Sequence, residues 1–153
     1  MQPSVNEIWQ WLEGVPDPEI PVVSVVDLGI VRSVAWNGDR LDVGLTPTYS
    51  GCPATSVISR DVETALRDRG IEKLAVETKL SPPWTTDWIS DKGRAKLLDY
   101  GIAPPDPVTR GPKACPYCKS DNVHLISQFG STPCKAQWRC GSCLEPFDYF
   151  KCL

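Results

Sequence analysis

The chain has 153 residues, of which 41% are hydrophobic and 23% charged, and its net charge at pH 7 is −3. These values are typical of one folded domain, or of a small domain with a metal-stabilised tail, and they exclude a largely disordered chain. No apolar run approaches the roughly 20 residues that a membrane helix needs. The N-terminus lacks the basic and apolar regions of a signal peptide, so we expect a cytoplasmic protein with reduced thiols.

Helical and strand patterns alternate in the first hundred residues. Ser4 and Glu7 have the spacing of a helix capping box, and Asn37-Gly38 between two apolar runs is a strong hairpin signal. Gly70 and Gly101 each follow a helical pattern and predict its end. In chain order we expect a helix near 4–12, hairpin strands at 30–36 and 41–45, a helix at 54–69, a strand at 74–80 and a helix at 91–100.

A proline-rich segment at 103–113 separates this region from a cysteine-rich tail. Such a segment is typical of a stiff, extended linker. Within the tail, 123–129 and 136–139 have strand patterns. The sequence therefore predicts an α+β protein, with a small mixed α/β domain at 1–102, a linker at 103–114 and a zinc ribbon at 115–153.

Four cysteines of the tail form two C-x-x-C pairs, Cys115 with Cys118 and Cys140 with Cys143. The two-residue gap lets both thiolates of a pair face one ion, and two pairs supply the four sulfur ligands of a tetrahedral zinc site. The 21 residues between the pairs fit a slightly long hairpin. We therefore expect structural zinc bound by these four residues.

Iron is an alternative to zinc, because four thiolates also bind a rubredoxin-type iron or an iron–sulfur cluster. Zinc is favoured because the spacing is that of structural sites and a ribbon of this size needs a metal to fold. Cys134 and Cys152 can pack as small apolar residues, bridge, or bind a second metal. His124 is the chain's one histidine, and four cysteines already complete the site, so we expect it on the surface of a strand.

Cys52 lies apart from the other six cysteines, just before Pro53 and a predicted helix. A helix N-terminus favours a thiolate, which makes Cys52 a candidate functional thiol. The alternative is a small buried residue in a tight turn. Asp17 and Glu19 lie in a loop stiffened by prolines, where acidic side chains are usually solvated or cap a turn.

The tail from Cys115 carries four basic and three acidic side chains, a net charge of +1. Nucleic-acid binding usually needs a basic face, so we expect no nucleic-acid partner. The sequence also has no glycine-rich phosphate loop and no dinucleotide-binding fingerprint.

The segments 17–21 (DPEIP), 27–31 (DLGIV) and 51–53 (GCP, before a helix) resemble the SufT-like family of iron–sulfur assembly proteins over roughly the first hundred residues. Further segments at 82–88, 100–105, 129–132, 134–135 and 145–152 resemble the D subunits of bacterial phenylacetyl-CoA 1,2-epoxidase, a multicomponent monooxygenase. This second resemblance runs nearly from end to end.

The resemblance implies a non-catalytic accessory subunit that acts in maturation, by insertion of an iron–sulfur cluster or iron into an epoxidase component. Its partners would be other epoxidase subunits. The resemblance also implies that Cys52 is the reactive or cluster-contacting thiol, and that Asp17 and Glu19 are motif acids without an assigned role. A structural adaptor that holds the subunits together through the ribbon is the alternative. Neither the sequence nor the resemblance fixes the oligomeric state.

Overall fold

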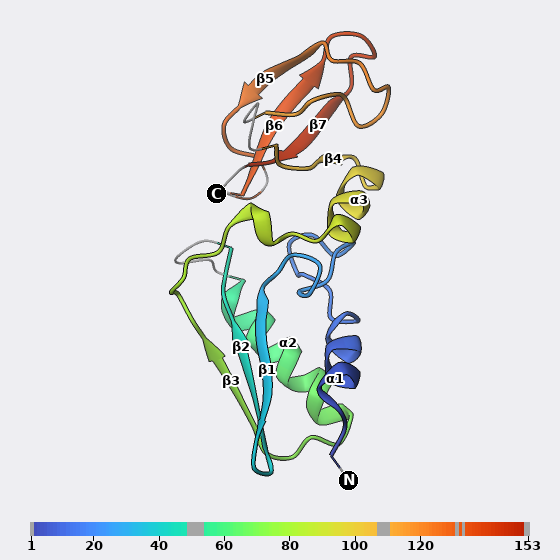
Figure 1. Cartoon of the computed structure of the whole chain (residues 1–153). Coiled ribbons are helices and arrows are strands. Elements are labelled where there is room, and N and C mark those ends of the chain that lie inside the picture. Colours follow the sequence, from blue (N-terminus) through green and yellow to red (C-terminus); the bar gives the residue numbers. More distant parts are fainter. Residues whose placement is uncertain (1, 49–53, 107–110, 131, 133, 152–153) are drawn as a thin grey trace. The chain divides into compact units, whose positions relative to one another are not determined.

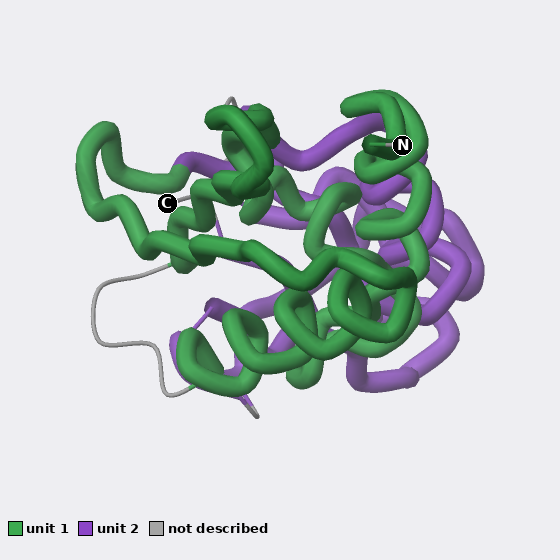
Figure 2. The backbone as a smooth tube through the Cα atoms, turned by 90° about the horizontal axis from the view of Figure 1, so that it is seen from below, with its two compact units in different colours: residues 1–84 green, residues 85–153 purple. Residues whose placement is uncertain are grey.

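The computed structural model describes residues 2–48, 54–106, 111–130, 132 and 134–151. The contacts divide the chain into two compact units, Met1–Trp84 and Thr85–Leu153 (Figure 2). Within the described residues, no helix combines the length and the apolar character that are required to cross a membrane.

The first unit contains a three-stranded sheet and two helices (Figure 1). The strand order is β1-β2-β3, with β1 antiparallel to β2 and β3 parallel to β2. Helix α2 joins the two parallel strands, which need a long crossover connection. The elements are α1 (Val5–Leu12), β1 (Val31–Asn37), β2 (Arg40–Leu45), α2 (Thr55–Asp68) and β3 (Leu74–Thr78).

The local signals in this unit are confirmed. Ser4 accepts a hydrogen bond from the Glu7 backbone, and the Glu7 carboxylate accepts one from the Ser4 backbone, which completes the capping box of α1. The hairpin forms, but its two-residue loop is Gly38-Asp39, because Asn37 still pairs with Arg40. Gly38 has a φ of 66°, in the left-handed region that glycine tolerates best.

Side chains at strand and helix periodicity build the core of this unit. Leu41, Val43 and Leu45 alternate along β2 and are buried, as the period of two along a strand requires. Helix α2 buries one stripe at a spacing of four residues, and it contacts both α1 and β3. The stripe consists of Ile58, Val62 and Leu66.

The second half of the loop between α1 and β1 is largely buried, and polar side chains hold it. The Asp27 carboxylate accepts from the Ser24 backbone at 3.1 Å, and the Ser24 hydroxyl accepts from the Asp27 backbone at 3.0 Å. The Trp84 indole donates to the Leu28 carbonyl at 2.8 Å. These bonds satisfy polar groups that would otherwise be costly to bury.

The second unit contains a four-stranded sheet of order β4-β7-β6-β5. Strand β6 is antiparallel to both β5 and β7, whereas β4 is parallel to β7. The elements are the 3₁₀ helix η1 (Thr86–Trp88), α3 (Asp91–Asp99), β4 (Ile102–Ala103), β5 (Val123–Ser127), β6 (Lys135–Cys140) and β7 (Pro146–Phe150).

Two strands of this unit are absent from the sequence prediction. Strand β7 begins at a proline, which can start a strand but cannot donate to its ladder. Strand β4 lies at the start of the predicted linker, yet Ala103 pairs with Tyr149 and is buried. The contact-based division after Trp84 therefore differs from the predicted boundaries at 102 and 115, which stay a prediction.

The core of the second unit joins two cysteines of the C-x-x-C pairs to the sheet. Cys115 and Cys140 are fully buried with Ala103, Ala136, Phe147 and Tyr149, and Val123 and Trp138 pack against them. The rings of Trp138 and Tyr149 meet edge to face, with centroids 6.1 Å apart. An aromatic pair of this geometry contributes about 0.5–1.5 kcal/mol beyond its buried area.

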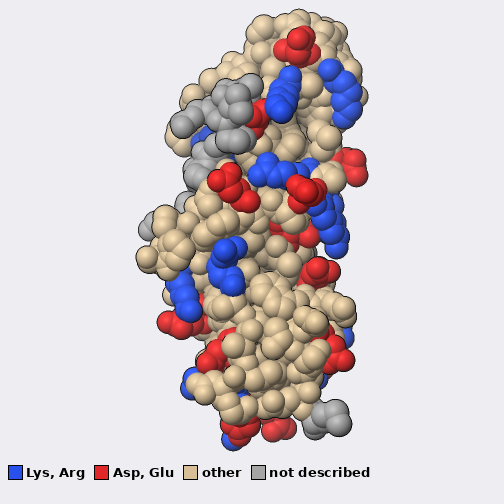
Figure 3. Space-filling model, in the orientation of Figure 1, with Lys and Arg blue, Asp and Glu red and all other residues tan. Residues whose placement is uncertain are grey.

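Basic and acidic side chains are interspersed on the face drawn in Figure 3. In the first unit, Arg40 pairs with Asp42, Arg67 with Glu63, and Lys73 with Asp39, all at exposed positions. Exposed pairs of this kind contribute about 1 kcal/mol or less each. The absence of a nucleic-acid partner stays a prediction.

Candidate metal centre

The two C-x-x-C segments form equivalent turns at one end of the ribbon sheet. Cys115–Cys118 precedes β5, and Cys140–Cys143 joins β6 to β7. Lys119, which follows the first segment, has a positive φ of 67°, and Leu144, which follows the second, has a positive φ of 68°. The sequence repeat is therefore also a repeat of backbone conformation.

Each turn directs backbone N–H groups at its first sulfur. The Cys115 sulfur accepts from the N–H groups of Tyr117 at 3.4 Å and Cys118 at 3.5 Å. The Cys140 sulfur accepts in the same way from Ser142 at 3.3 Å and Cys143 at 3.4 Å. Hydrogen bonds of this kind stabilise a thiolate, which is the form that binds a metal.

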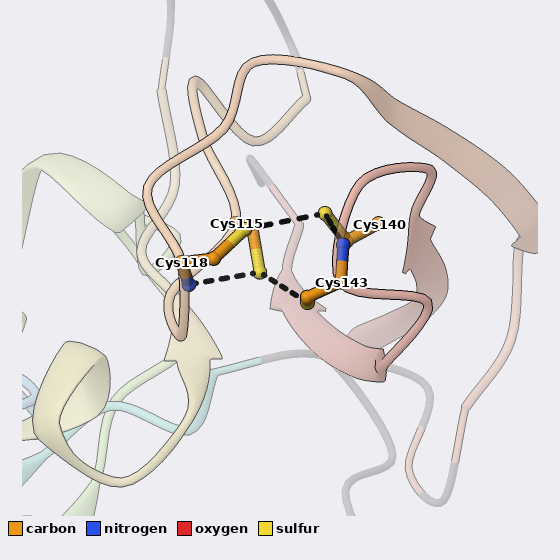
Figure 4. Close-up of side chains that lie close together, drawn as sticks. All are labelled: Cys115, Cys118, Cys140 and Cys143. Carbon is orange, nitrogen blue, oxygen red and sulfur yellow. Dashed lines mark hydrogen bonds between the residues drawn. The ribbon is translucent and has the colours of Figure 1, made fainter.

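The four sulfur atoms lie within 4.8 Å of one another, and Figure 4 shows the two turns directing them toward one another. The Cys115 and Cys143 sulfurs are 3.7 Å apart, and those of Cys118 and Cys140 are 3.5 Å apart. A tetrahedral zinc ion with Zn–S bonds of about 2.3 Å holds its sulfurs about 3.8 Å apart. The four residues therefore fit a metal ion of this size.

Two thiols of the cluster have strongly shifted pKa values. The N–H groups of Cys143 and Ser142 outweigh desolvation and lower the pKa of Cys140 to about 6. The Glu145 backbone lowers the pKa of Cys143, but desolvation and the neighbouring thiols raise it to about 12. A second negative charge is unfavourable among four close sulfurs, and a bound cation removes this repulsion.

The hydroxyls of two serines and the backbone carbonyl of an asparagine, which the sequence prediction omitted, hold the two turns together. The hydroxyls of Ser120 and Ser142 are 2.8 Å apart, and the Gly141 N–H donates to the Asn122 carbonyl at 2.7 Å. Their position within or just beyond the C-x-x-C segments is the only signal that could have identified them. They are supporting residues, because the structure places none of them among the four sulfur ligands.

Cys134 and His124, the other described candidates of the tail, are not among the four residues of the cluster. Cys134 is buried, and its sulfur is 2.9 Å from the Thr132 hydroxyl oxygen. His124 lies on β5 with an exposed side chain, as predicted. Cys52 and Cys152 lie outside the described residues, so the predictions about them stay predictions.

Asp17 has a structural position in the first unit. Its carboxylate is buried and accepts from the backbone N–H groups of Glu19 at 3.0 Å and Ile20 at 2.8 Å. This arrangement caps the turn of the proline-rich loop. Glu19, the other motif acid, is half-buried.

A cavity of about 420 Å³ adjoins Cys115 within the second unit. Its basic side chains already have partners: Arg94 and Lys119 donate to backbone carbonyls, and Lys113 pairs with Asp106 at 3.4 Å. The four-cysteine cluster is therefore the site that the geometry of the described residues supports best.

Comparison with known protein families gives two matches along the chain. Residues 6–77 match the family model of an iron–sulfur cluster assembly protein, and residues 107–151 match the PaaD zinc beta ribbon domain. The first match covers nearly all of the sheet and both helices of the first unit, and the second covers all four cysteines of the cluster.

Two known proteins are similar to this chain in sequence. A protein of Escherichia coli K12, provisionally named as the D subunit of 1,2-phenylacetyl-CoA epoxidase, is 48% identical, over 99% of this chain and 94% of its own length. The Fe-S protein maturation auxiliary factor YitW of Bacillus subtilis is 38% identical, over 56% of this chain and 85% of its own length.

Solved structures match about three fifths of the chain. A domain of unknown function, DUF59, from Bacillus anthracis is 30% identical with a TM-score of 0.55, over 60% of this chain and 89% of its own. A conserved hypothetical protein from Thermotoga maritima is 28% identical with a TM-score of 0.54, over 63% of this chain and 95% of its own. With its assembly-type domain, its four-cysteine ribbon and its near full-length identity, the chain belongs to the family of phenylacetyl-CoA epoxidase D subunits.

Proposed function

We propose that this protein is a non-catalytic accessory subunit that matures a component of a phenylacetyl-CoA epoxidase, by helping to insert an iron–sulfur cluster or iron during aerobic phenylacetate breakdown. One observation carries the proposal: a domain of the iron–sulfur assembly type lies in a chain that is 48% identical to a D-type epoxidase subunit over nearly its whole length. The similarity to a maturation auxiliary factor supports the same role.

The four-cysteine cluster binds zinc with a structural purpose in this proposal. All four coordination positions are supplied by Cys115, Cys118, Cys140 and Cys143, which leaves no open position for a substrate. The buried first cysteine of each pair belongs to the core of the ribbon. Iron that is being delivered to a client would therefore contact another part of the chain.

Cys52 is the residue that we propose for contact with the cluster or iron in transit. Its support is the Gly51-Cys52-Pro53 segment before α2 and the match of residues 6–77 to an assembly family. Asp17 is a poor candidate for a metal ligand, because its carboxylate already accepts two backbone hydrogen bonds. The chain has a single histidine, so it lacks the usual carboxylate and histidine ligand set of a di-iron oxygenase.

The variant Cys52→Ala tests this role, with Cys134→Ala as the matched control for loss of a thiol outside the metal cluster. We expect Cys52→Ala cells to fail to grow on phenylacetate and their epoxidase to assemble with less iron, measured by metal analysis of enzyme purified without oxygen. Cys134→Ala should support growth if the chain stays folded. Normal growth and normal iron content of the Cys52→Ala strain would show that Cys52 only packs.

A structural adaptor is the second candidate, because the ribbon exposes large apolar side chains at its turns, including Tyr117 and Leu144. A strain that lacks the chain separates the two functions. Epoxidase subunits that still co-purify but lack metal support maturation, whereas subunits that no longer co-purify support the adaptor.

A further inference from the structure

The four-cysteine cluster has an excess of negative charge when it holds the zinc that we propose for it. Four thiolates outweigh the charge of one Zn²⁺ by two negative charges. Cys115 and Cys140 are fully buried in the core of the ribbon, where water cannot screen this charge. Cationic side chains beside the cluster would therefore stabilise its metal-bound form.

Lys119 folds back over the first C-x-x-C turn. It follows Cys118 directly in the chain, and its ammonium donates to the carbonyl of Pro116 at 3.0 Å, next to Cys115. The lysine is therefore held at both ends of the turn, by the chain at one end and by a hydrogen bond at the other. Its positive charge lies beside the first pair of sulfur ligands.

Arg139 spans the second turn in the same way. It precedes Cys140 directly on β6, and its guanidinium donates through Nε to the carbonyl of Leu144 at 3.2 Å, next to Cys143. One cation thus follows its C-x-x-C segment and the other precedes it, yet each is tied to the backbone beside both cysteines of its pair. Each turn has a cation of its own.

No acidic side chain of the described residues neutralises either cation. None of the salt bridges between these residues involves Lys119 or Arg139. A backbone carbonyl accepts a hydrogen bond but has no net charge, so each side chain keeps its full positive charge beside the turn. The two cations therefore equal in number the excess negative charges of the zinc-bound cluster.

We propose that Lys119 and Arg139 offset the negative charge of the zinc-bound cluster and thereby strengthen zinc binding. This inference rests on the zinc site of the proposed function. The two residues are positioning residues that act on the thiolates through space, because cysteine sulfurs supply all four ligands. Salt screens attraction between charges near the surface, so their contribution should fall as the salt concentration rises. A hydrogen bond that only closes the turn would lack this salt dependence.

The zinc affinity of the full chain tests this proposal, measured by competition with a chromophoric chelator in about 25 mM NaCl, where screening is weak. Lys119→Gln and Arg139→Gln each keep an N–H donor for the carbonyl but remove the charge. Each should raise the zinc dissociation constant by about two- to fivefold, as expected for loss of an exposed ionic attraction. The double variant should multiply the two effects, and Lys119→Arg should keep the wild-type affinity.

Lys151→Gln is the matched control for loss of a cation that binds a carbonyl. The Lys151 ammonium donates to the Gln128 carbonyl at 2.8 Å, but Lys151 follows the five-residue strand β7, which begins just after the second turn. A strand of this length spans roughly 16 Å, which exceeds the Debye length of about 8–10 Å in ordinary buffers. Lys151→Gln should therefore leave the zinc dissociation constant unchanged.

A repeat in about 1 M NaCl separates charge from hydrogen bonding, because the two Gln variants should then approach the wild-type affinity. The absorption of Co²⁺-loaded protein checks that four thiolates bind the metal in every variant. A wild-type chain that binds no zinc would overturn the zinc site itself. Tight zinc binding that both Gln variants retain would overturn only the charge offset, as would equal weakening at both salt concentrations or by Lys151→Gln.

Discussion

At the scale of single residues, the two acidic residues of the DPEIP segment, Asp17 and Glu19, differ in burial and in role. Asp17 is buried and caps a turn, whereas Glu19 is half-buried beside it. Three prolines and a buried carboxylate fix this loop, which leads toward the first strand of the sheet. Asp17 therefore contributes to stability through the backbone that it holds.

Asp17→Ala should lower the free energy of unfolding by about 1–2 kcal/mol, because the N–H groups of Glu19 and Ile20 lose their acceptor. Asp17→Asn keeps one acceptor oxygen and should lower the free energy of unfolding by less. Urea denaturation of the full chain, followed by tryptophan fluorescence, measures both. Equal stability of the wild type and Asp17→Ala would contradict the capping role.

At the scale of elements, we expect the two C-x-x-C turns to determine whether the ribbon strands can form. The turns connect to β5, β6 and β7, and two of the four cysteines are part of the buried core between these strands. A metal ion adds binding free energy that a ribbon of this size cannot obtain from its apolar core alone.

Cys118→Ser should lose the bound zinc and unfold the ribbon. Cys118 is exposed, so the substitution removes a ligand without creating a cavity. Hydrogen exchange followed by mass spectrometry should show lost protection in β5, β6 and β7 and retained protection in β1, β2 and β3. Cys134→Ser is the control and should keep full zinc content. Full zinc content in Cys118→Ser would exclude the four-cysteine site.

At the scale of the whole molecule, the division of the chain is the main difference from the sequence prediction. The predicted linker begins at 103, but β4 at Ile102–Ala103 pairs with β7 and is buried in the second unit. Helix α3 contacts β4 within the same unit. The residues that separate the two compact units therefore lie near Trp84.

A fragment that begins at Thr85 should be more stable than one that begins at Cys115, because only the longer fragment contains β4. Burial of an isoleucine such as Ile102 contributes about 1.5–3 kcal/mol. Thermal unfolding of the two zinc-loaded fragments measures the difference. Equal stability would favour the boundary at 115 that the sequence predicts.

The sequence by itself determined the features that depend on neighbouring residues. These include the capping box of α1, the hairpin at Gly38, the helix that ends before Gly70 and the two C-x-x-C turns. Each is set by local backbone preference or by a short fixed spacing, which a pattern in one segment can reveal. Short segments along the chain already resembled the epoxidase D subunits, and the near full-length similarity shows that the chain belongs to that family.

Only the tertiary structure decided the features that depend on distant partners. The pairing of β4 with β7 brings together residues about 46 positions apart, and two residues of β4 carry too weak a pattern to predict. The position of β5 at one end of the described sheet depends on which strand is its neighbour. The sulfur cluster joins two turns that are separated in the sequence by β5 and β6. Contacts between the sulfurs and between the serine hydroxyls connect these turns. These contacts form only on folding, because their energy comes from surfaces that meet across the chain.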